Sequence, residues 1–218
     1  MTSKKLVKPK SPSRNPEGRP KSAEKRVAIM DAAELHFLES GYERTSLDTV
    51  AKTALVSKLT IYSHFADKDA LFKAIIERKC EQHSIFQSYL ELAALPPREA
   101  LEQIGFNFMS LILSDAAIKL HRTIEAESPR DPKSALLFYE AGPMRVKRAF
   151  RELLEVWVKQ KKLKVSDYEI ACEQFFSVMK GEPHMKVLLN VAQKPTLAAL
   201  KKHVKAGVLL FLNSYGCA

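Results

Sequence analysis

The sequence has little glycine, little cysteine and no long uninterrupted apolar run. Its 7 glycines, beside many Leu, Ala, Glu and Lys residues, favour helices over strands. The 3 cysteines, Cys80, Cys172 and Cys217, are far apart and form neither a CxxC nor a His-rich spacing, so we expect no disulfide framework, metal site or cofactor. No apolar run is long enough for a membrane span, and the start lacks the apolar core of a signal peptide, so we expect a cytoplasmic protein without membrane segments.

Positive charge is concentrated at the start of the chain. Residues 1–26 hold nine Lys or Arg against two Glu, whereas the whole chain of 218 residues has a formal net charge of +10. The rest of the chain is therefore nearly neutral. A basic arm on such a body suits a polyanion such as nucleic acid, to which it adds attraction without sequence preference. A solubilising tail is the alternative interpretation.

The first part of the chain has the pattern of three short helices. Ser22 is a plausible N-cap of the first helix and Gly41 ends it. Thr45 can cap the second helix, Ser57 the third, and Asp67 a much longer fourth that runs to about residue 92 and belongs to both head and body. A turn at residues 54–56 separates the second and third helices, which is typical of a helix-turn-helix.

Hydrophobic residues make up 46% of the whole chain, which is enough for a sizeable core. The sequence after the first three helices therefore predicts a larger helical body. We therefore expect an all-α protein of about nine helices. Gly142 and Pro143 are expected to interrupt the seventh helix. Further helix starts are predicted at Pro96, Asp115, Ser166 or Asp167, and Thr196.

The last two predicted helices carry apolar residues at helical spacing. Such a stripe needs a partner helix. Intramolecular core is one interpretation. A dimer interface is the other, because helix-turn-helix modules usually work as two-fold dimers on palindromic sites. The candidate dimer residues are Tyr168, Phe175, Met179, Leu200, Val204, Val208 and Phe211.

Residues 18–76 resemble the TetR/AcrR family of bacterial transcriptional regulators. Many separate positions agree in register, among them FLESGY, TSLDTVAK, VSK, the Tyr and His-Phe of SKLTIYSHF, and DKDALF. A second stretch, IEAESPRDPKSALLFYEAGPMRVKRAF, resembles the ligand-binding body of a subgroup of the family. The resemblance implies a basic arm over 1–21, a DNA-binding head over 22–66 and a ligand-binding and dimerisation body over 67–218.

The sequence departs from the family at two positions of the head. The family commonly has Gly where this chain has Leu55, in the turn, and often has a second Gly at the position of Leu59. A left-handed Leu55 would cost about 1 to 2 kcal/mol. Leu59 gains roughly 1 kcal/mol of helix propensity and places an apolar side chain on the DNA-facing surface, where it can contact thymine methyl groups. We therefore expect an operator preference shifted from that of related proteins.

The third helix is expected to enter the major groove of double-stranded DNA. Ser57 caps this helix. Lys58 and Thr60 can reach bases or the DNA backbone, and Leu59 lies on the same DNA-facing surface. The resemblance implies phosphate contacts for Tyr62, His64 and Lys68, and Thr45 can donate to another phosphate. In the arm, Arg19 of the GRP sequence can enter the minor groove. Phe65 is expected in the core.

The resemblance also implies a small-molecule effector, bound among the fourth to seventh helices. The candidate pocket residues are Phe86, Phe106, Met109, His121 and Phe138; Trp157 is assigned to packing. We expect a sequence-specific repressor that binds a palindromic operator as a homodimer and is released by its effector. The alternatives are a nonspecific DNA-binding or adaptor protein that uses the basic arm, and an enzyme. No catalytic motif supports the enzyme.

Overall fold

The computed structural model describes residues 23–83 and 89–217. These residues form helices, and an isolated β-bridge pairs Leu163 with Gly216. The prediction of an all-α fold is confirmed. The helices are α1 (Ala23–Arg44), α2 (Leu47–Thr53), α3 (Lys58–His64), α4 (Lys68–Gln82), α5 (Tyr89–Ala94), α6 (Pro97–Ile112), α7 (Asp115–Glu127), α8 (Pro132–Tyr139), a π-helical segment (Glu140–Met144), α9 (Arg145–Lys159), α10 (Tyr168–Leu188) and α11 (Leu197–Tyr215).

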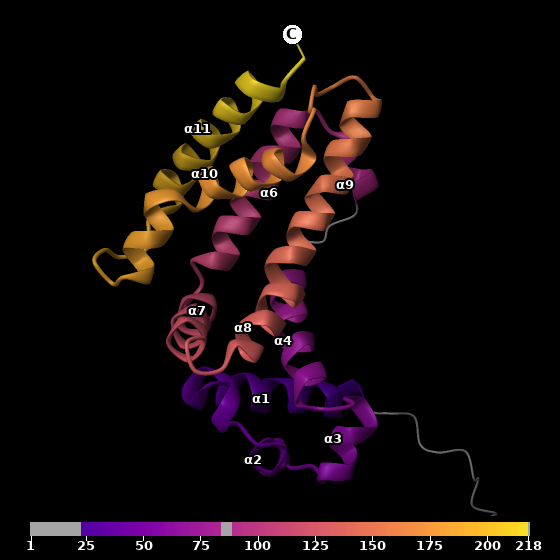
Figure 1. Cartoon of the computed structure of the whole chain (residues 1–218), viewed down its shortest axis with the longest axis vertical. Coiled ribbons are helices and arrows are strands. Elements are labelled where there is room, and N and C mark those ends of the chain that lie inside the picture. The colour runs from indigo at the N-terminus through magenta and orange to yellow at the C-terminus, as the bar shows by residue number, and fades with distance from the viewer. Residues whose placement is uncertain (1–22, 84–88, 218) are drawn as a thin grey trace, which may run out of the picture.

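The molecule is elongated along one axis, and α1 lies across that axis at one end (Figure 1). Helices α1, α2 and α3 gather at one end, and the chain ends near the opposite end, after α11. Helix α4 rises from the α1–α3 group and leads into the body, where α11 packs against α6 and α10. In the described ranges, none of the helices is both long and apolar enough to cross a membrane.

Helices α1 to α4 enclose an aromatic core. Phe37, Tyr42 and Phe72 contact one another with ring centroids 5.0 to 5.9 Å apart. The same cluster of buried residues includes Ile124 of α7 and Leu137 of α8, so the body contributes to the core beneath the head. Helix α4 belongs to both parts, as predicted, because Phe72 lies in this cluster while Cys80 of the same helix packs with body residues.

The body has its own core, centred on aromatic side chains. Trp157 is fully buried, which confirms its assignment to packing. Phe150 stacks on Phe175 with centroids 4.6 Å apart, and Phe211 meets the edge of Phe175 at 5.3 Å. Aromatic pairs at such distances stabilise a core beyond the area that they bury.

Several helix boundaries agree with the prediction because their caps do. Ser57, Asp67, Asp167 and Thr196 each accept a hydrogen bond from a backbone N–H of the first helical turn. Gly41 ends the regular part of α1 with φ 82°, in the region that favours glycine.

Four boundaries differ from the prediction. Ser46 caps α2 in place of Thr45, and Ser114 caps α7 in place of Asp115. Helix α4 ends at Gln82 rather than near residue 92. Gly142 and Pro143 do not interrupt the seventh predicted helix: α8 continues into α9 through the π-helical segment, whose wider turn accommodates a proline that has no N–H to donate.

Candidate DNA-binding surface and ligand cavity

The turn between α2 and α3 adopts the conformation that the sequence predicts to be costly. Leu55 has φ 53°, and its side chain is 92% exposed. The Leu55 N–H donates to the Lys52 carbonyl at 3.3 Å, and the next N–H, of Val56, donates to the Ala51 carbonyl at 3.0 Å. These bonds close the turn, and Ser57 then begins α3.

Helix α3 packs one side on the core and leaves the other side open. Ile61 is fully buried, and Phe65, directly after the helix, is buried as predicted. On the open side Leu59 is 79% exposed and Tyr62 is 48% exposed. An exposed face with these groups fits the width of a DNA major groove.

The polar residues at the start of α3 bind neighbouring side chains. Lys58 Nζ lies 2.9 Å from a carboxylate oxygen of Asp48, on α2, and both side chains are exposed. The hydroxyls of Ser57 and Thr60 lie 2.9 Å apart. Because these contacts are at the surface, a phosphate or a base can replace them without uncovering a buried charge.

Two predicted phosphate contacts, Thr45 and Lys68, are engaged elsewhere in the head. Thr45 is buried, and its hydroxyl donates to the Gly41 carbonyl at 2.7 Å, so Thr45 offers no donor at the surface. Lys68 Nζ donates to the carbonyls of Tyr42 and Glu43 at 3.0 and 3.3 Å and lies 4.3 Å above the Tyr42 ring. Lys68 therefore binds the C-terminal end of α1, where helix carbonyls attract a cation.

Tyr42 connects this region to the body. Its hydroxyl donates to Asp69, and burial together with the Asp69 carboxylate raises the pKa of Tyr42, so the phenol stays protonated. The backbone N–H of Tyr42 donates to Glu127 Oε2 at 3.1 Å. Since Glu127 is the last residue of α7, this bond joins a body helix to the end of α1.

A cavity of about 460 Å³ lies between the head and the body. Its walls come from α1, α4, α6, α7, the α8–α9 segment and α10. They are mainly apolar and include Phe72, Phe108, Phe138 and Phe176, of which Phe108 and Phe176 lie 4.8 Å apart. A cavity of this size and lining is typical of a small-molecule site.

The predicted pocket residues divide into two groups. His121 and Phe138 line the cavity, with ring centroids 5.9 Å apart. Met109, which is fully buried in the body core, and Phe106, which packs against that core, do not line this cavity. The spacing of apolar residues on α6 did not reveal which side faces the cavity. Phe86 lies outside the described residues, as do the basic arm and Arg19.

The structure adds His184 to the cavity, a residue that the sequence analysis did not select. The His184 ring lies 5.5 Å from that of His121 and is only 4% exposed. Burial, Lys180 and His121 lower the pKa of His184 to about 4, and burial also lowers the pKa of His121. Both imidazoles are therefore neutral near pH 7.

Two features hold His184 in this place. Helix α10 bends at Gly181, which has φ 38°, just before Pro183. Arg122 of α7 then donates to the carbonyls of Leu188 and Val187, at 2.7 and 2.8 Å, at the end of α10. The sequence offered a signal in the Gly and Pro beside His184, because both residues bend helices.

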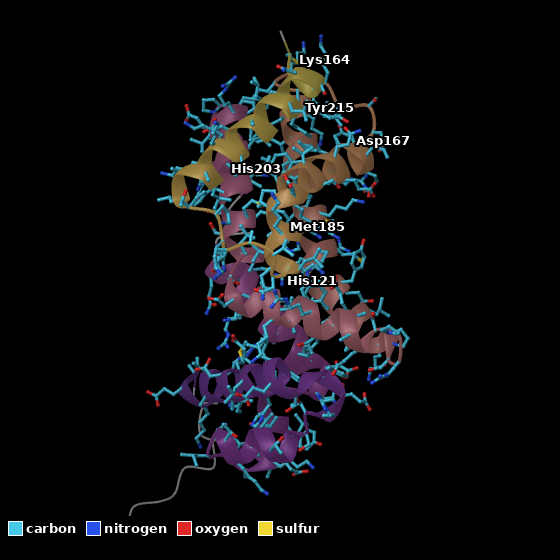
Figure 2. All side chains as sticks on the ribbon, turned by 90° about the vertical axis from the view of Figure 1, so that its left-hand side faces the viewer. His121, Lys164, Asp167, Met185, His203 and Tyr215 are labelled. Atoms are coloured by element: carbon cyan, nitrogen blue, oxygen red, sulfur yellow. The ribbon has the colours of Figure 1, made fainter. Side chains whose placement is uncertain are left out.

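Most of the residues predicted for the dimer interface are buried within the chain. Phe175, Met179, Leu200, Val204, Val208 and Phe211 lie in the body core, and Tyr168 is partly buried against it. For the six buried residues the prediction was wrong, because the apolar stripes of α10 and α11 pack on each other and on α6; for Tyr168 it stays a prediction. Figure 2 looks onto these two helices, with Met185, His203 and Tyr215 labelled along them. The exposed apolar residues of this region are Ile170, Met185, Leu189, Val191, Leu197, Leu209 and Leu210.

Two protein-family models match the chain. Residues 99–217 match the model of the C-terminal domain of AefR-like transcriptional repressors, and residues 29–75 match that of the bacterial regulatory proteins of the tetR family. The repressor BepR of Brucella suis is 36% identical over 95 residues, which are 43% of this chain and 46% of BepR. The curated relatives are matched over between 19% and 56% of their own length.

Solved structures are matched over most of their length. A TetR-family protein of Mesorhizobium loti is 26% identical with a TM-score of 0.75, and the match covers 92% of this chain and 100% of that one. The flavonoid-responsive regulator FrrA is 32% identical with a TM-score of 0.70, over 89% of this chain and 98% of FrrA. With both family models matched and the helix-turn-helix in place, the chain belongs to the TetR/AcrR family of transcriptional regulators.

Proposed function

We propose that the chain is a repressor that binds a palindromic operator as a homodimer in the cytoplasm and leaves it when a small molecule enters the cavity. The observation that carries this proposal is the composition of the cavity wall. Glu34, Phe37 and Leu38 of α1 line the same cavity as His184 of α10. A ligand there contacts the head and the far body at once, which is unnecessary for an enzyme and required for a switch.

On the DNA side, α3 enters the major groove with its exposed face. Lys58, Leu59 and Thr60 contact base edges or phosphates, and Tyr62 and His64 hold phosphates. Ser57 begins the helix, and Arg19 of the basic arm, residues 1–21, reaches the minor groove. In this proposal residues 22–66 form the DNA-binding head, and residues 67–218 form the ligand-binding and dimerisation body. The description of BepR as a repressor supports repression rather than activation.

Effector binding acts on the head by two routes. One is the direct contact of a ligand with α1. The other is α7, because His121 lines the cavity and Glu127 of the same helix binds the Tyr42 N–H. A shift of α7 moves the end of α1 and changes the distance between the two recognition helices of a dimer. FrrA is named as flavonoid-responsive, which supports a small organic effector.

For the dimer, we propose the outward side of α10 and α11. Leu209 and Leu210 of α11, and Met185 and Leu189 near the end of α10, expose apolar side chains there. Exposed apolar residues grouped on one face are typical of a protein interface. The core residues of the same two helices support this surface from beneath.

The test is selection of fragmented host DNA by the purified protein near physiological salt, followed by sequencing. A Tyr62→Ala/His64→Ala variant serves as control, and Lys52→Ala, an exposed residue of α2, as a second surface change in the head. We expect a palindromic site that wild type and Lys52→Ala enrich and the double variant loses. Recovery of all fragments alike, unchanged in the double variant, would instead indicate the nonspecific protein that uses its basic arm.

A further inference from the structure

The polar groups of the cavity do not balance in charge. Lys79 is paired with Glu34 at 2.6 Å, and Lys147 is paired with Glu173 at 2.8 Å; all four residues line the cavity. Lys180 also lines it, and across residues 23–83 and 89–217 no carboxylate pairs with its ammonium. The lining therefore has one positive charge in excess.

Lys180 lines the cavity together with His121 and His184. Its charge contributes to lowering the pKa of both histidines. Glu125, whose side chain is exposed, has a carboxylate oxygen 3.6 Å from His121 Nε2. One end of the cavity thus joins a lysine ammonium to two neutral imidazoles.

His184 is the second, independent observation. It is 4% exposed and lines the cavity, and within residues 23–83 and 89–217 it has no hydrogen-bond partner. Its imidazole is therefore available to hydrogen-bond a ligand in the cavity. A neutral imidazole presents one N–H donor, and with Lys180 these rings provide the donors that a single oxyanion needs.

The rest of the wall indicates the shape of the ligand. Phe108 and Phe176 from the body face the same space as Phe72 of α4 and Phe138 of α8. Aromatic side chains prefer offset or edge contacts with other rings. Flat rings are therefore favoured over flexible chains in this cavity.

We infer that the cavity binds an aromatic molecule with one acidic oxygen group, a carboxylate or an acidic phenol, whose oxyanion is held by Lys180, His121 and His184. The ring system lies among Phe72, Phe108, Phe138 and Phe176. This inference rests on the proposed function, because it names the chemical class of the effector.

Isothermal titration calorimetry with the full chain tests the inference. The probes are 2-naphthoate, its uncharged analogue 2-naphthamide, and decanoate as an acid without a ring. We expect 2-naphthoate to bind about tenfold or more tightly than either other probe, as a charge-assisted contact in an apolar site requires. Lys180→Met should remove the preference for the acid over the amide. Lys119→Met, an exposed lysine of α7 outside the cavity, should leave it unchanged.

A second variant, His184→Phe, keeps a ring of similar size and removes the nitrogens. It should weaken 2-naphthoate several-fold and leave 2-naphthamide closer to its original affinity, while an unchanged melting temperature shows that the body is folded. Equal affinities of wild type for the acid and the amide, or binding of neither, would overturn the inference. Tight binding of decanoate would overturn the inference that the ligand is aromatic. If Lys119→Met lost the preference for the acid as fully as Lys180→Met, the assignment of the charge contact to Lys180 would be overturned.

Failure of the proposed function gives a different result. If 2-naphthoate binds with the expected charge preference but leaves the affinity for the selected operator unchanged, the ligand class holds and ligand release is wrong. If operator binding is specific but neither naphthalene probe binds, the DNA function holds and the ligand class is wrong.

Discussion

The exposed faces of α3 and α11 differ, although both helices bury apolar side chains. Helix α3 buries Ile61 and exposes Lys58 and Tyr62, with Leu59 as the one apolar group of its open side that is strongly exposed in the described structure. Helix α11 buries Val204, Val208 and Phe211 and still exposes Leu209 and Leu210. The first surface suits a charged polymer and the second an apolar partner.

This difference shows when an apolar stripe in the sequence indicates which side of a helix is exposed. Where only one side of a helix is apolar, the other side is the exposed one. Where apolar residues occur on both sides, the stripe that is easier to see in the sequence is the one that the chain buries within itself. Substitutions on each helix separate these cases.

The largest effect is expected from the two sides of α11. Phe211→Ala removes a buried ring that contacts Phe150, Phe175 and Tyr215, and should lower the free energy of unfolding by about 3 to 5 kcal/mol. Leu210→Ala, next to it in sequence but exposed, should change the unfolding of the monomer by less than about 0.5 kcal/mol. Urea unfolding of both variants measures this difference.

Sedimentation of the same two proteins completes the test. Leu210→Ala should weaken self-association, because the proposed dimer surface loses an apolar side chain. A Leu210→Ala protein that associates like wild type would remove Leu210 from that surface. If Phe211→Ala proved as stable as wild type, the description of this side of α11 as core would be wrong.

This pair of faces also shows what the sequence can predict. The structure of the head can be predicted from local signals in the sequence, because the serine caps, Gly41 and the single inward Ile61 of α3 specify helix ends and exposed sides. The cavity cannot be predicted in this way, because His184 reaches His121 only through the bend at Gly181 and the bonds of Arg122 to α10. Contacts between distant segments decide which side of a body helix is open.

The next largest effect is the response of the body to acid. His184 has a pKa of about 4 in the folded chain, below the ordinary value of 6.5. The unfolded chain thus binds a proton first, and stability falls as the pH drops from about 6.5 to 4, by up to about 3 kcal/mol. His121, whose pKa is lowered too, adds to the same slope; Glu125, which lies beside it, is exposed.

Urea unfolding between pH 7.5 and 4.5 measures this slope against a His184→Gln variant. Since every other titrating group is shared, the difference between the two proteins isolates His184. We expect the variant to lose less stability than wild type over this range. Parallel curves would show that His184 has the same pKa in the folded and the unfolded chain.

A smaller effect is expected where head and body join. Gly41→Ala places a Cβ in a left-handed residue, 1.7 Å from the present position of Glu127 Oε1. The side chain must move and its bond to the Tyr42 N–H is lost, for a cost of about 2 kcal/mol. Thermal unfolding with Gly142→Ala as the control, where the nearest atom is 3.2 Å away, measures this cost.

The double variant Gly41→Ala/Glu127→Ala separates the two causes. If the steric conflict with Glu127 contributes, the two substitutions should cost less together than the sum of their separate effects. Strict additivity would leave only the backbone conformation of Gly41 as the cause. DNA affinity of Glu127→Ala would then report whether the bond to Tyr42 also affects the recognition helix.

The smallest effect has opposite signs at two neighbouring positions of the head. Leu55→Gly relieves a left-handed residue whose exposed side chain packs on little, and should stabilise the head by about 1 kcal/mol. Leu59→Gly, within α3, should destabilise it by about 1 kcal/mol because glycine weakens a helix. Thermal unfolding of both variants measures the signs. If both variants lost stability, the Leu55 side chain would contribute contacts that its exposure does not suggest. If the signs are opposite and only Leu59→Gly changes the selected operator, Leu55 acts in the turn and Leu59 contacts the DNA.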